Sequence, residues 1–373
     1  MQKFLLLIYI LCFPLYLFAQ DNNKQAKMEM ALRKLSMAHL AIMNLYVDEV
    51  YENKLTEDAI KQLKEQGMKN LILDLQQNGG GYMDAATNIA NEFLEKGDMI
   101  VYTQGLKVPH SEYRAHGSGM FKDGKIVVLV DEYSASAAEI VTGAIQDHDR
   151  GYIVGRRTFG KGLVQRPFML PDGSMIRLTV ARYYTPSGRC IQKPYTMGDK
   201  KKYSMDVVDR LNHGELTNID SIHFPDSLKY TTLRKKRTVY GGGGIMPDFF
   251  IPLDTTRFTR LYRELVAKGT IVSASLKYID KHRKKLNKSY PTFDSYKASF
   301  NVPKEIIDLI LSEGKQHGVE PKDDEELQKT LPELKLQLKA LIARDLWDMS
   351  EYFAIMYQDN AFVKKALEVL EEE

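Results

Sequence analysis

The chain has 373 residues, which is long enough for two or three domains. Hydrophobic residues make up 44% and charged residues 27% of it, the balance of an ordinary globular protein that can bury a sizeable core. Its 52 basic and 49 acidic residues leave a formal net charge of +3. For this length that charge is too small to indicate binding to nucleic acid or to a membrane surface.

The first residues of the chain differ from the rest. A short basic start, MQK, precedes an apolar run from Phe4 to Phe18, and Ala19 then leads into polar residues. This order is typical of a secretory signal peptide and predicts cleavage after Ala19. A membrane anchor is the alternative, but a run of about 15 residues is shorter than the roughly 20 that a spanning helix needs. We expect an exported, periplasmic protein without a transmembrane segment once residues 1–19 are removed.

Only one cysteine, Cys190, lies beyond this leader, so an internal disulfide is excluded. It lies in the segment SGRCIQ, which has no helix start or glycine-rich turn that would activate a thiolate. We expect Cys190 to be structural.

The predicted elements alternate between strands and helices through the first half of the chain. Residues 20–63 have apolar residues at helical spacing, and buried strands and helices follow at 71–75, 82–95, 126–130, 137–146 and 152–154. This alternation predicts an α/β sheet covered by helices. A β-hairpin is then predicted, with strands at 163–170 and 174–184 around a Pro-Asp-Gly turn.

The second half changes character twice. Residues 195–245 are polar and read as irregular, and the chain becomes helical after Thr256. Apolar residues from Leu334 to Met356, just after Pro332, predict one amphipathic packing helix. The predicted division is a signal peptide at 1–19, a helical segment at 20–63, a core at 64–255 and a helical C-terminal domain at 256–373.

Three turns that follow predicted strands have residue types that can do chemistry. The first, DLQQNGGGYMDAA, contains Gly79 to Gly81 between a strand and a helix. Free amide groups at such a helix start attract negative charge, so the turn can serve as an oxyanion hole. A phosphate loop is less consistent because no Gly-Lys-Ser or Gly-Lys-Thr follows. A plain strand-to-helix turn remains an alternative.

The second turn, VDEYSASAAE, places Ser136 at a strand-to-helix junction, where a hydroxyl can be exposed above a sheet. The alternative is a capping box, in which Ser136 caps the helix and Glu139 reaches back.

The third turn, RRTFGKGLVQ, places Lys161 between two glycines and beside apolar residues. Most lysines are solvated surface charges. A lysine that points inward from such a turn would favour the neutral amine, which is the form a general base requires.

Together these segments resemble the C-terminal processing peptidases, which are serine endopeptidases of the tail-specific protease type. The resemblance is carried by five segments that lie in order between residues 71 and 248: LILDLQQNGGG, VLVDEYSASAAEIVTGAIQD, IVGRRTFGKGLVQ, YYTPSGRCIQ and GGGGIMPD. It implies a core with the crotonase and Clp-protease α/β fold, polypeptide substrates and an acyl-enzyme mechanism without a cofactor.

The resemblance also implies a role for individual residues. Ser136, the second serine of the SAS motif, is expected to be the nucleophile and Lys161 the general base. Gln165 is expected to orient the lysine. The backbone amides of Ala137 and of a glycine in the first turn, Gly80, are expected to bind the oxyanion. A base positioned beside a serine can replace the histidine of a triad, and none of the eight histidines lies in a triad motif.

The sequence shows no cluster of His, Cys or carboxylate residues with metal-ligand spacing, so no metal is expected.

The sequence departs from the usual layout of the resembled family. That layout has a PDZ domain and a leading strand before the LILDL strand, whereas Leu55 to Gly67 leaves no room for either. Without the PDZ domain, capture of a substrate's C-terminal tail is expected to change, and the sheet is expected to have a new edge. Gln76 replaces the arginine common after the LILDL strand.

We therefore predict an exported Ser–Lys endopeptidase, with homo-oligomerisation left open. The first rival is a non-catalytic binding or scaffold protein that kept the peptidase core. The second is a lipid- or acyl-binding protein of crotonase-like fold, in which Ser136 and Lys161 would need no fixed spacing.

Overall fold

The computed structural model describes residues 52–372, which form two compact units. The first unit runs to Pro252 and also includes the C-terminal residues from Lys365, and the second comprises Leu253–Lys364. The signal peptide predicted at 1–19 and most of the helical segment predicted at 20–63 lie outside the described residues. Within the described part, none of the helices combines the length and apolar character needed to cross a membrane.

The first unit is built around a parallel sheet. Its four strands lie in the order β1 (Asn70–Asp74), β4 (Lys125–Val130), β5 (Tyr152–Gly155) and β10 (Phe249–Phe250), and every neighbouring pair is parallel. Strand β4 is buried along almost its whole length, as expected for a run of β-branched and leucine residues between two covering layers. The mixed α/β architecture agrees with the alternation in the sequence, and β1 is an edge strand of the described sheet.

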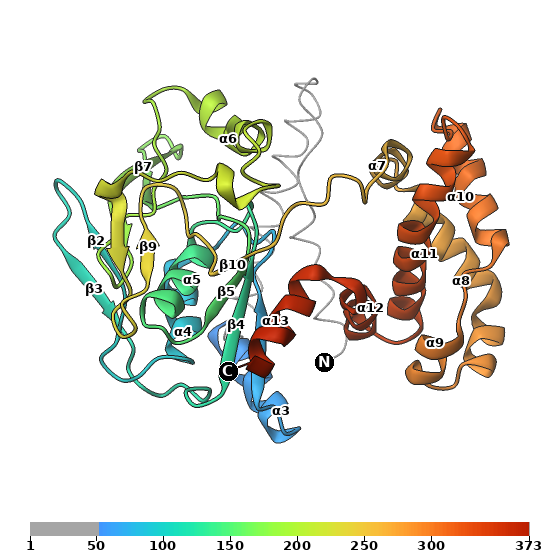
Figure 1. Ribbon diagram of the computed structural model, residues 1–373, viewed down its shortest axis with the longest axis horizontal. Coiled ribbons are helices and arrows are strands. Elements are labelled where there is room, and N and C mark those ends of the chain that lie inside the picture. Colours follow the sequence, from blue (N-terminus) through green and yellow to red (C-terminus); the bar gives the residue numbers. More distant parts are fainter. Residues whose placement is uncertain (1–51, 373) are drawn as a thin grey trace. The chain divides into compact units, whose positions relative to one another are not determined.

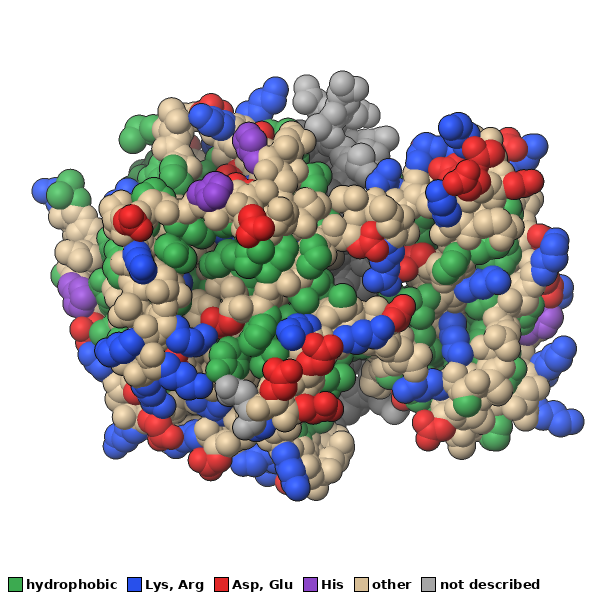
Figure 2. All heavy atoms as spheres, viewed as in Figure 1, with side chains coloured by type: hydrophobic (Ala, Val, Ile, Leu, Met, Phe, Trp, Pro, Cys, Tyr) green, Lys and Arg blue, Asp and Glu red, His purple; other side chains and the backbone are tan. Residues whose placement is uncertain are grey.

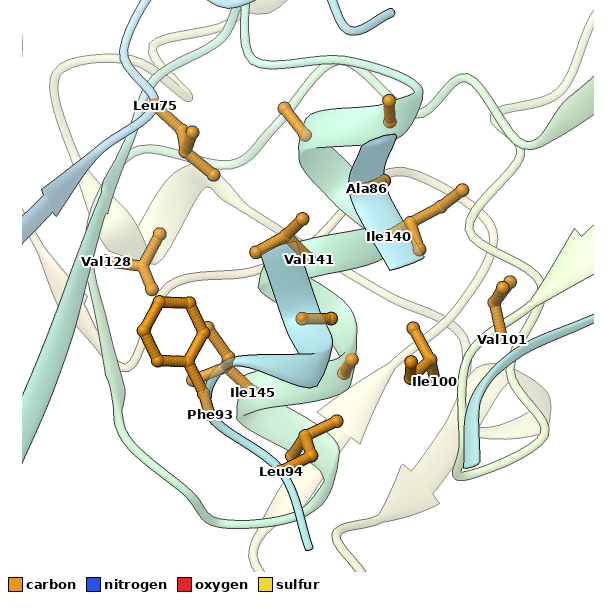
Figure 3. Close-up of a cluster of buried hydrophobic side chains, with 14 of the residues drawn as sticks. Leu75, Ala86, Phe93, Leu94, Ile100, Val101, Val128, Ile140, Val141 and Ile145 are labelled. Atoms are coloured by element: carbon orange, nitrogen blue, oxygen red, sulfur yellow. The ribbon is translucent and has the colours of Figure 1, made fainter. Parts of the chain in front are cut away.

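Two helices cover this sheet and form the core with it. They are α4 (Met83–Asn91), which is shorter than the predicted 82–95, and α5 (Ala137–Asp147). Every residue of α5 is buried, and the helix packs against α4, β2 and β5. Figure 3 shows apolar side chains from α5, including Ile140, Val141 and Ile145, in one buried cluster that also contains Phe93 and Val128. This packing fixes the N-terminal end of α5 relative to the sheet.

A second, antiparallel sheet contains the predicted hairpin. Its strands lie in the order β3 (Ser111–Arg114), β2 (Met99–Gln104), β7 (Met175–Tyr184) and β6 (Leu163–Met169). Strands β6 and β7 form the hairpin close to its predicted bounds, whereas β2 and β3 were not predicted. The first unit also contains helix α3 (Glu52–Glu65), the small hairpin of β8 (Lys229–Thr231) and β9 (Thr238–Tyr240), and the end of helix α13 (Ala361–Glu372).

Residues 195–245 are less irregular than the sequence suggested. They contain helix α6 (Lys200–Asn212), which lies along the upper edge of the unit in Figure 1. The Asp199 carboxylate caps it by accepting a hydrogen bond from the Lys202 amide at 2.9 Å. The apolar positions of α6 are few, so its sequence pattern resembles that of a polar loop.

The second unit is entirely helical, in agreement with the helical pattern after Thr256, and buries its own apolar cluster. Its helices are α7 (Arg260–Ala267), α8 (Thr270–Ser289), α9 (Phe293–Ser299), α10 (Lys304–Gln316), α11 (Asp324–Leu346) and α12 (Met349–Met356), with α13 beginning at Ala361. Acidic and basic side chains both lie over the visible face of this unit and of the first (Figure 2).

The prediction of one helix between Leu334 and Met356 was wrong. Helix α11 begins earlier because Asp323 caps it, accepting from the Glu326 amide at 2.8 Å, and it continues through Pro332. It ends at Trp347, whose backbone is not helical, and Asp348 caps the separate helix α12. The apolar spacing continues across this break, so periodicity alone did not show it.

Candidate active site

The three turns singled out in the sequence meet at one edge of the parallel sheet. They follow the carboxyl ends of β1, β4 and β5, which point the same way because the strands are parallel. Ligand and catalytic sites of α/β proteins lie at this edge, where loops and helix starts converge.

Ser136 has the most constrained backbone in the site. It precedes helix α5 with φ of 57° and ψ of −115°, a region that residues other than glycine rarely occupy. The Glu139 carboxylate accepts a hydrogen bond from the Ser136 amide at 2.8 Å, which is one half of the predicted capping box. The Ser136 side chain also approaches the Glu139 amide, so both halves of the capping box that was the alternative expectation for Ser136 are present. A serine on a strained strand-to-helix turn is the arrangement that exposes a nucleophile.

Ser134 is placed quite differently. Its hydroxyl is buried, donates to the Leu75 carbonyl at 2.7 Å and accepts from the Asp131 amide at 2.9 Å. Ser134 is therefore a structural residue that joins the ends of β1 and β4.

The strain at Ser136 leads to a stability prediction. We expect Ser136→Gly to raise the free energy of unfolding by about 1 kcal/mol relative to Ser136→Ala, because glycine adopts a positive φ without steric cost. Urea denaturation of the two variants measures this difference. Equal stability of the two variants would show that the backbone at Ser136 is not strained.

Asp131 joins the glycine turn to the serine turn. Its Oδ1 accepts hydrogen bonds from the amides of Gln77 and Tyr133 at 2.9 Å each and from Ser134 at 3.1 Å. Burial, and secondarily the neighbouring Glu132 carboxylate, raise the pKa of Asp131 to about 6, while the Gln77 and Tyr133 amides and the Arg156 guanidinium act in the opposite direction. The carboxyl group therefore binds its proton more strongly in the folded than in the unfolded chain.

The raised pKa predicts a pH-dependent stability. The stabilising contribution is fully present below the ordinary pKa of 3.8 and is lost as the pH rises through about 6. We expect the unfolding free energy of the wild type, relative to Asp131→Asn, to fall by about 3 kcal/mol between pH 3.5 and pH 7. Urea titrations of both proteins test this, and a difference that stays constant or grows with pH would contradict it.

Gly80 lies directly against the start of α5. It has φ of 90°, and a Cβ atom there would lie 2.6 Å from the Ala135 carbonyl oxygen and 2.7 Å from the Ala137 nitrogen. Only glycine fits this approach, so Gly80 lies directly against the amide nitrogen of Ala137, the other predicted oxyanion donor. The Gly80 amide donates to the Asn78 side-chain oxygen at 2.9 Å. The Ala137 amide is the first of α5, where helix geometry provides no partner within the helix.

Glu139 joins the serine turn to the lysine turn. Its carboxylate is completely buried and accepts four hydrogen bonds. One oxygen accepts from the Thr158 hydroxyl at 2.5 Å and from the Gly160 amide at 2.7 Å, and the other accepts from the amides of Ser136 and Lys161 at 2.8 Å each. Burial raises the pKa of Glu139 although these four donors lower it. The amide nitrogens of Ser136 and Lys161 share one oxygen atom, so the two turns are adjacent.

Tyr183, on β7, contacts the same two residues from the other side. Its ring is buried, and its hydroxyl lies 3.0 Å from the Ser136 carbonyl oxygen and also contacts the Lys161 carbonyl oxygen. Burial, and secondarily the nearby Glu139, raise the pKa of Tyr183 well above its ordinary value, so it remains a hydrogen-bond donor. Both carbonyls are thereby held by one rigid side chain.

The unpredicted helix α6 supports the lysine turn from outside. Buried Arg210 donates to the carbonyls of Thr158 at 2.8 Å and Phe159 at 3.1 Å. Burial, with the nearby Arg157 charge, lowers the pKa of Arg210 to about 10. On the other flank, the Gln192 side chain accepts from the Gly162 amide at 2.8 Å. The turn that presents Lys161 is therefore fixed on both sides.

Lys161 itself is half-buried in this turn. Gln165, the predicted orienting residue, is exposed on β6 beside a register shift and pairs with Thr179 of β7. Across residues 52–372, no hydrogen bond joins the Gln165 side chain to Lys161. The structure thus brings together the turns of Gly80, Ser136 and Lys161 and places Gln165 on the adjoining strand.

Cys190 is half-buried and pairs with Tyr184. Burial raises the pKa of its thiol, which suits a structural residue better than a nucleophile. No group of three or more His, Cys, Asp or Glu side chains in the described part of the chain is placed to hold a metal ion.

The site therefore has a serine at a strained helix start, with the lysine turn and the glycine turn beside it. Residues 38–200 match the model of peptidase family S41. Residues 261–348 of the helical unit match a family of unknown function, DUF8443.

Several of the similar proteins are named for C-terminal processing. The chain is 42% identical over 139 residues to "C-terminal processing peptidase, chloroplastic" of Tetradesmus obliquus, covering 37% of this chain and 29% of the relative. It is 39% identical over 176 residues to the "Carboxyl-terminal-processing protease" of Synechocystis sp., covering 47% and 39%. A "Probable CtpA-like serine protease" of Staphylococcus aureus is 37% identical over 158 residues, covering 41% and 32%. The chain thus spans well under half the length of each relative.

Among solved structures, a photosystem II D1 C-terminal processing protease is 40% identical, with 36% of this chain and 35% of that one covered and a TM-score of 0.35.

Proposed function

We propose that the protein is a serine endopeptidase that cleaves polypeptides near their C-termini through an acyl-enzyme on Ser136. The observation that carries the proposal is the shared Glu139 oxygen, which binds the amides of Ser136 and Lys161. A nucleophile and its base must be held in a fixed relation, and here one buried carboxylate contacts both turns. The match to the S41 peptidase model and the names of the relatives support the same reaction class.

In the proposed reaction, the side-chain nitrogen of Lys161 accepts the hydroxyl proton of Ser136 while the serine oxygen bonds to the scissile carbonyl carbon. The negative charge that develops on the carbonyl oxygen is bound by the amides of Ala137 and Gly80. The tetrahedral intermediate collapses, the C–N bond breaks, and the lysine returns its proton to the leaving amine. Water then attacks the ester by the same route in reverse, with Lys161 again as the base.

Two features of the site complete this proposal. The Gly80 amide must exchange the Asn78 side chain for the substrate oxygen, and such hydrogen bonds commonly rearrange when a substrate binds. Gln165 is proposed to turn towards Lys161 from the neighbouring strand. No metal or cofactor takes part in this scheme.

The cellular location belongs to the same proposal. Residues 1–19 are proposed to direct export into the periplasm and to be removed after Ala19. N-terminal sequencing of the protein from a periplasmic fraction tests this, and a mature chain that retains the apolar run would contradict it.

The reaction is tested with an unfolded polypeptide that has an apolar C-terminal tail. Full-length wild type, Ser136→Ala and Lys161→Ala are incubated with it, and the fragments are identified by mass spectrometry. We expect cleavage by the wild type alone. Cleavage that is undiminished in Ser136→Ala would overturn the proposal, and a folded wild type without activity towards any tailed substrate would favour the non-catalytic scaffold.

A further inference from the structure

The hairpin of β6 and β7 exposes an apolar surface. Phe168 pairs with Ile176 and Arg166 pairs with Leu178, and residues two apart on a strand share a face, so all four side chains lie on one face of the hairpin. Phe168, Ile176 and Leu178 are 47%, 49% and 52% exposed. Three neighbouring large apolar side chains are rarely exposed to solvent together unless the surface binds a partner.

Strand β6 is also an edge strand that begins beside the candidate active site. It lies at the end of the order β3-β2-β7-β6, so alternate backbone amides and carbonyls along its free edge have no strand partner. It starts at Leu163, two residues after Lys161. Pro167 has no amide hydrogen and interrupts the row of donors. The part of the edge that can pair continuously with another strand, residues 163–166, is therefore the part nearest to Lys161.

The charges on the two strands of the hairpin are of one sign. Arg166, Arg177 and Arg182 are exposed, and none of them has an ion-pair partner among residues 52–372. The single carboxylate between residues 163 and 184, Asp172, accepts hydrogen bonds from Ser174 in the turn. An apolar face with unpaired arginines complements a ligand that has apolar side chains and a carboxylate.

We propose that this hairpin is the binding surface for the substrate polypeptide. An extended segment pairs with the free edge of β6 between Leu163 and Arg166. Its apolar side chains lie on the face of Phe168, Ile176 and Leu178, and a carboxylate of the segment contacts Arg166. This inference rests on the proposed peptidase function, because a strand paired at Leu163 leads directly to the turn of Lys161.

A second copy of the chain is a less suitable occupant of the surface. Pairing two β6 edges about a twofold axis would bring the unpaired arginines of both copies onto one surface, and like charges placed opposite each other are destabilising. A polypeptide with a carboxylate avoids this repulsion.

The test measures peptide binding without cleavage. Full-length Ser136→Ala is titrated into a fluorescein-labelled peptide with alternating leucines, one glutamate and a free C-terminal carboxylate, and fluorescence anisotropy gives the Kd. We expect the added changes Ile176→Ser and Leu178→Ser to raise Kd about 10-fold or more, since they remove two apolar contacts. We expect Arg166→Glu to weaken binding of this peptide and to strengthen binding of a lysine-containing counterpart.

Leu276→Ser is the matched control, because Leu276 is 46% exposed on α8 of the helical unit and is not part of the hairpin, and it should leave Kd unchanged. Thermal unfolding confirms that each variant is folded. Labelling of Ser136 by a small fluorophosphonate, in the wild-type background, tests the peptidase function separately from the binding surface. If Ser136 is labelled but the hairpin variants bind the peptide as tightly as the parent, the inference about the surface is overturned. If Ser136 is not labelled, the peptidase function itself is contradicted. Hairpin variants that dissociate a dimer in light scattering without changing Kd would assign the surface to a second copy and also overturn it.

Discussion

Glu139→Ala is expected to reduce peptide cleavage by at least about 10²-fold and to lower the free energy of unfolding by about 3–5 kcal/mol. The change leaves the Thr158 hydroxyl and the amides of Ser136, Gly160 and Lys161 without their buried acceptor. Each unpaired buried donor costs free energy, and the serine and lysine turns lose their shared contact. Cleavage of a tailed polypeptide and urea denaturation measure the two effects.

Glu92→Ala is the matched control for loss of a buried carboxylate. Glu92 is also buried and accepts from the Met120 amide at 3.0 Å, but it contacts none of the three turns of the site. We expect this variant to be less stable than the wild type and to keep its activity. If Glu139→Ala and Glu92→Ala lose activity only in proportion to stability, Glu139 has no positioning role.

Gly80→Ala is expected to reduce the rate of cleavage by about 10²–10³-fold, the range measured when an oxyanion donor is lost. A methyl group at Gly80 would overlap the backbone of Ala135 and Ala137, and the residue would also have to keep φ of 90°. The first turn must therefore move away from the start of α5, and its amide moves with it. The rate constants kcat and kcat/KM for a peptide substrate measure this loss.

Gly81→Ala separates this effect from a general effect of the glycine turn. A Cβ atom on Gly81 would meet no heavy atom within 4 Å, and its φ is not in the left-handed region. We expect activity close to that of the wild type. A Gly81→Ala variant as impaired as Gly80→Ala, or a fully active Gly80→Ala, would show that the amide of Gly80 is not at the reaction centre.

The positions of the three turns could be predicted from the sequence because each signal is local. Buried strands at 71–75, 126–130 and 152–154 are each followed by a glycine- or serine-rich turn, and parallel strands bring such turns to one edge. The choice of Ser136 over Ser134 came from the resemblance, and the hydrogen bonds of Ser134 give a structural reason for it.

The groups that support the site could not be predicted in the same way. The sequence predicts Glu139 only as a helix cap. Its contacts with Gly160 and Lys161 join residues more than twenty positions apart, and no local pattern indicates them. Tyr183 and Arg210 reach the site from a distant strand and from a helix whose sequence is polar, and no local pattern marks them. Pairing of β2 with β7 is equally non-local, which explains why the strands of the second sheet were missed apart from the hairpin.

The reaction of Ser136 with a fluorophosphonate probe tests the central claim most directly. Full-length wild type, Lys161→Ala and Ser136→Ala are treated at neutral pH, and peptide mapping by mass spectrometry locates the modified serine over time. We expect modification at Ser136 in the wild type, none at Ser134, and a rate about 10²–10⁴-fold lower in Lys161→Ala, the usual contribution of a general base. A folded wild type that is not modified at Ser136, or a rate that Lys161→Ala leaves unchanged, would contradict a serine nucleophile activated by Lys161.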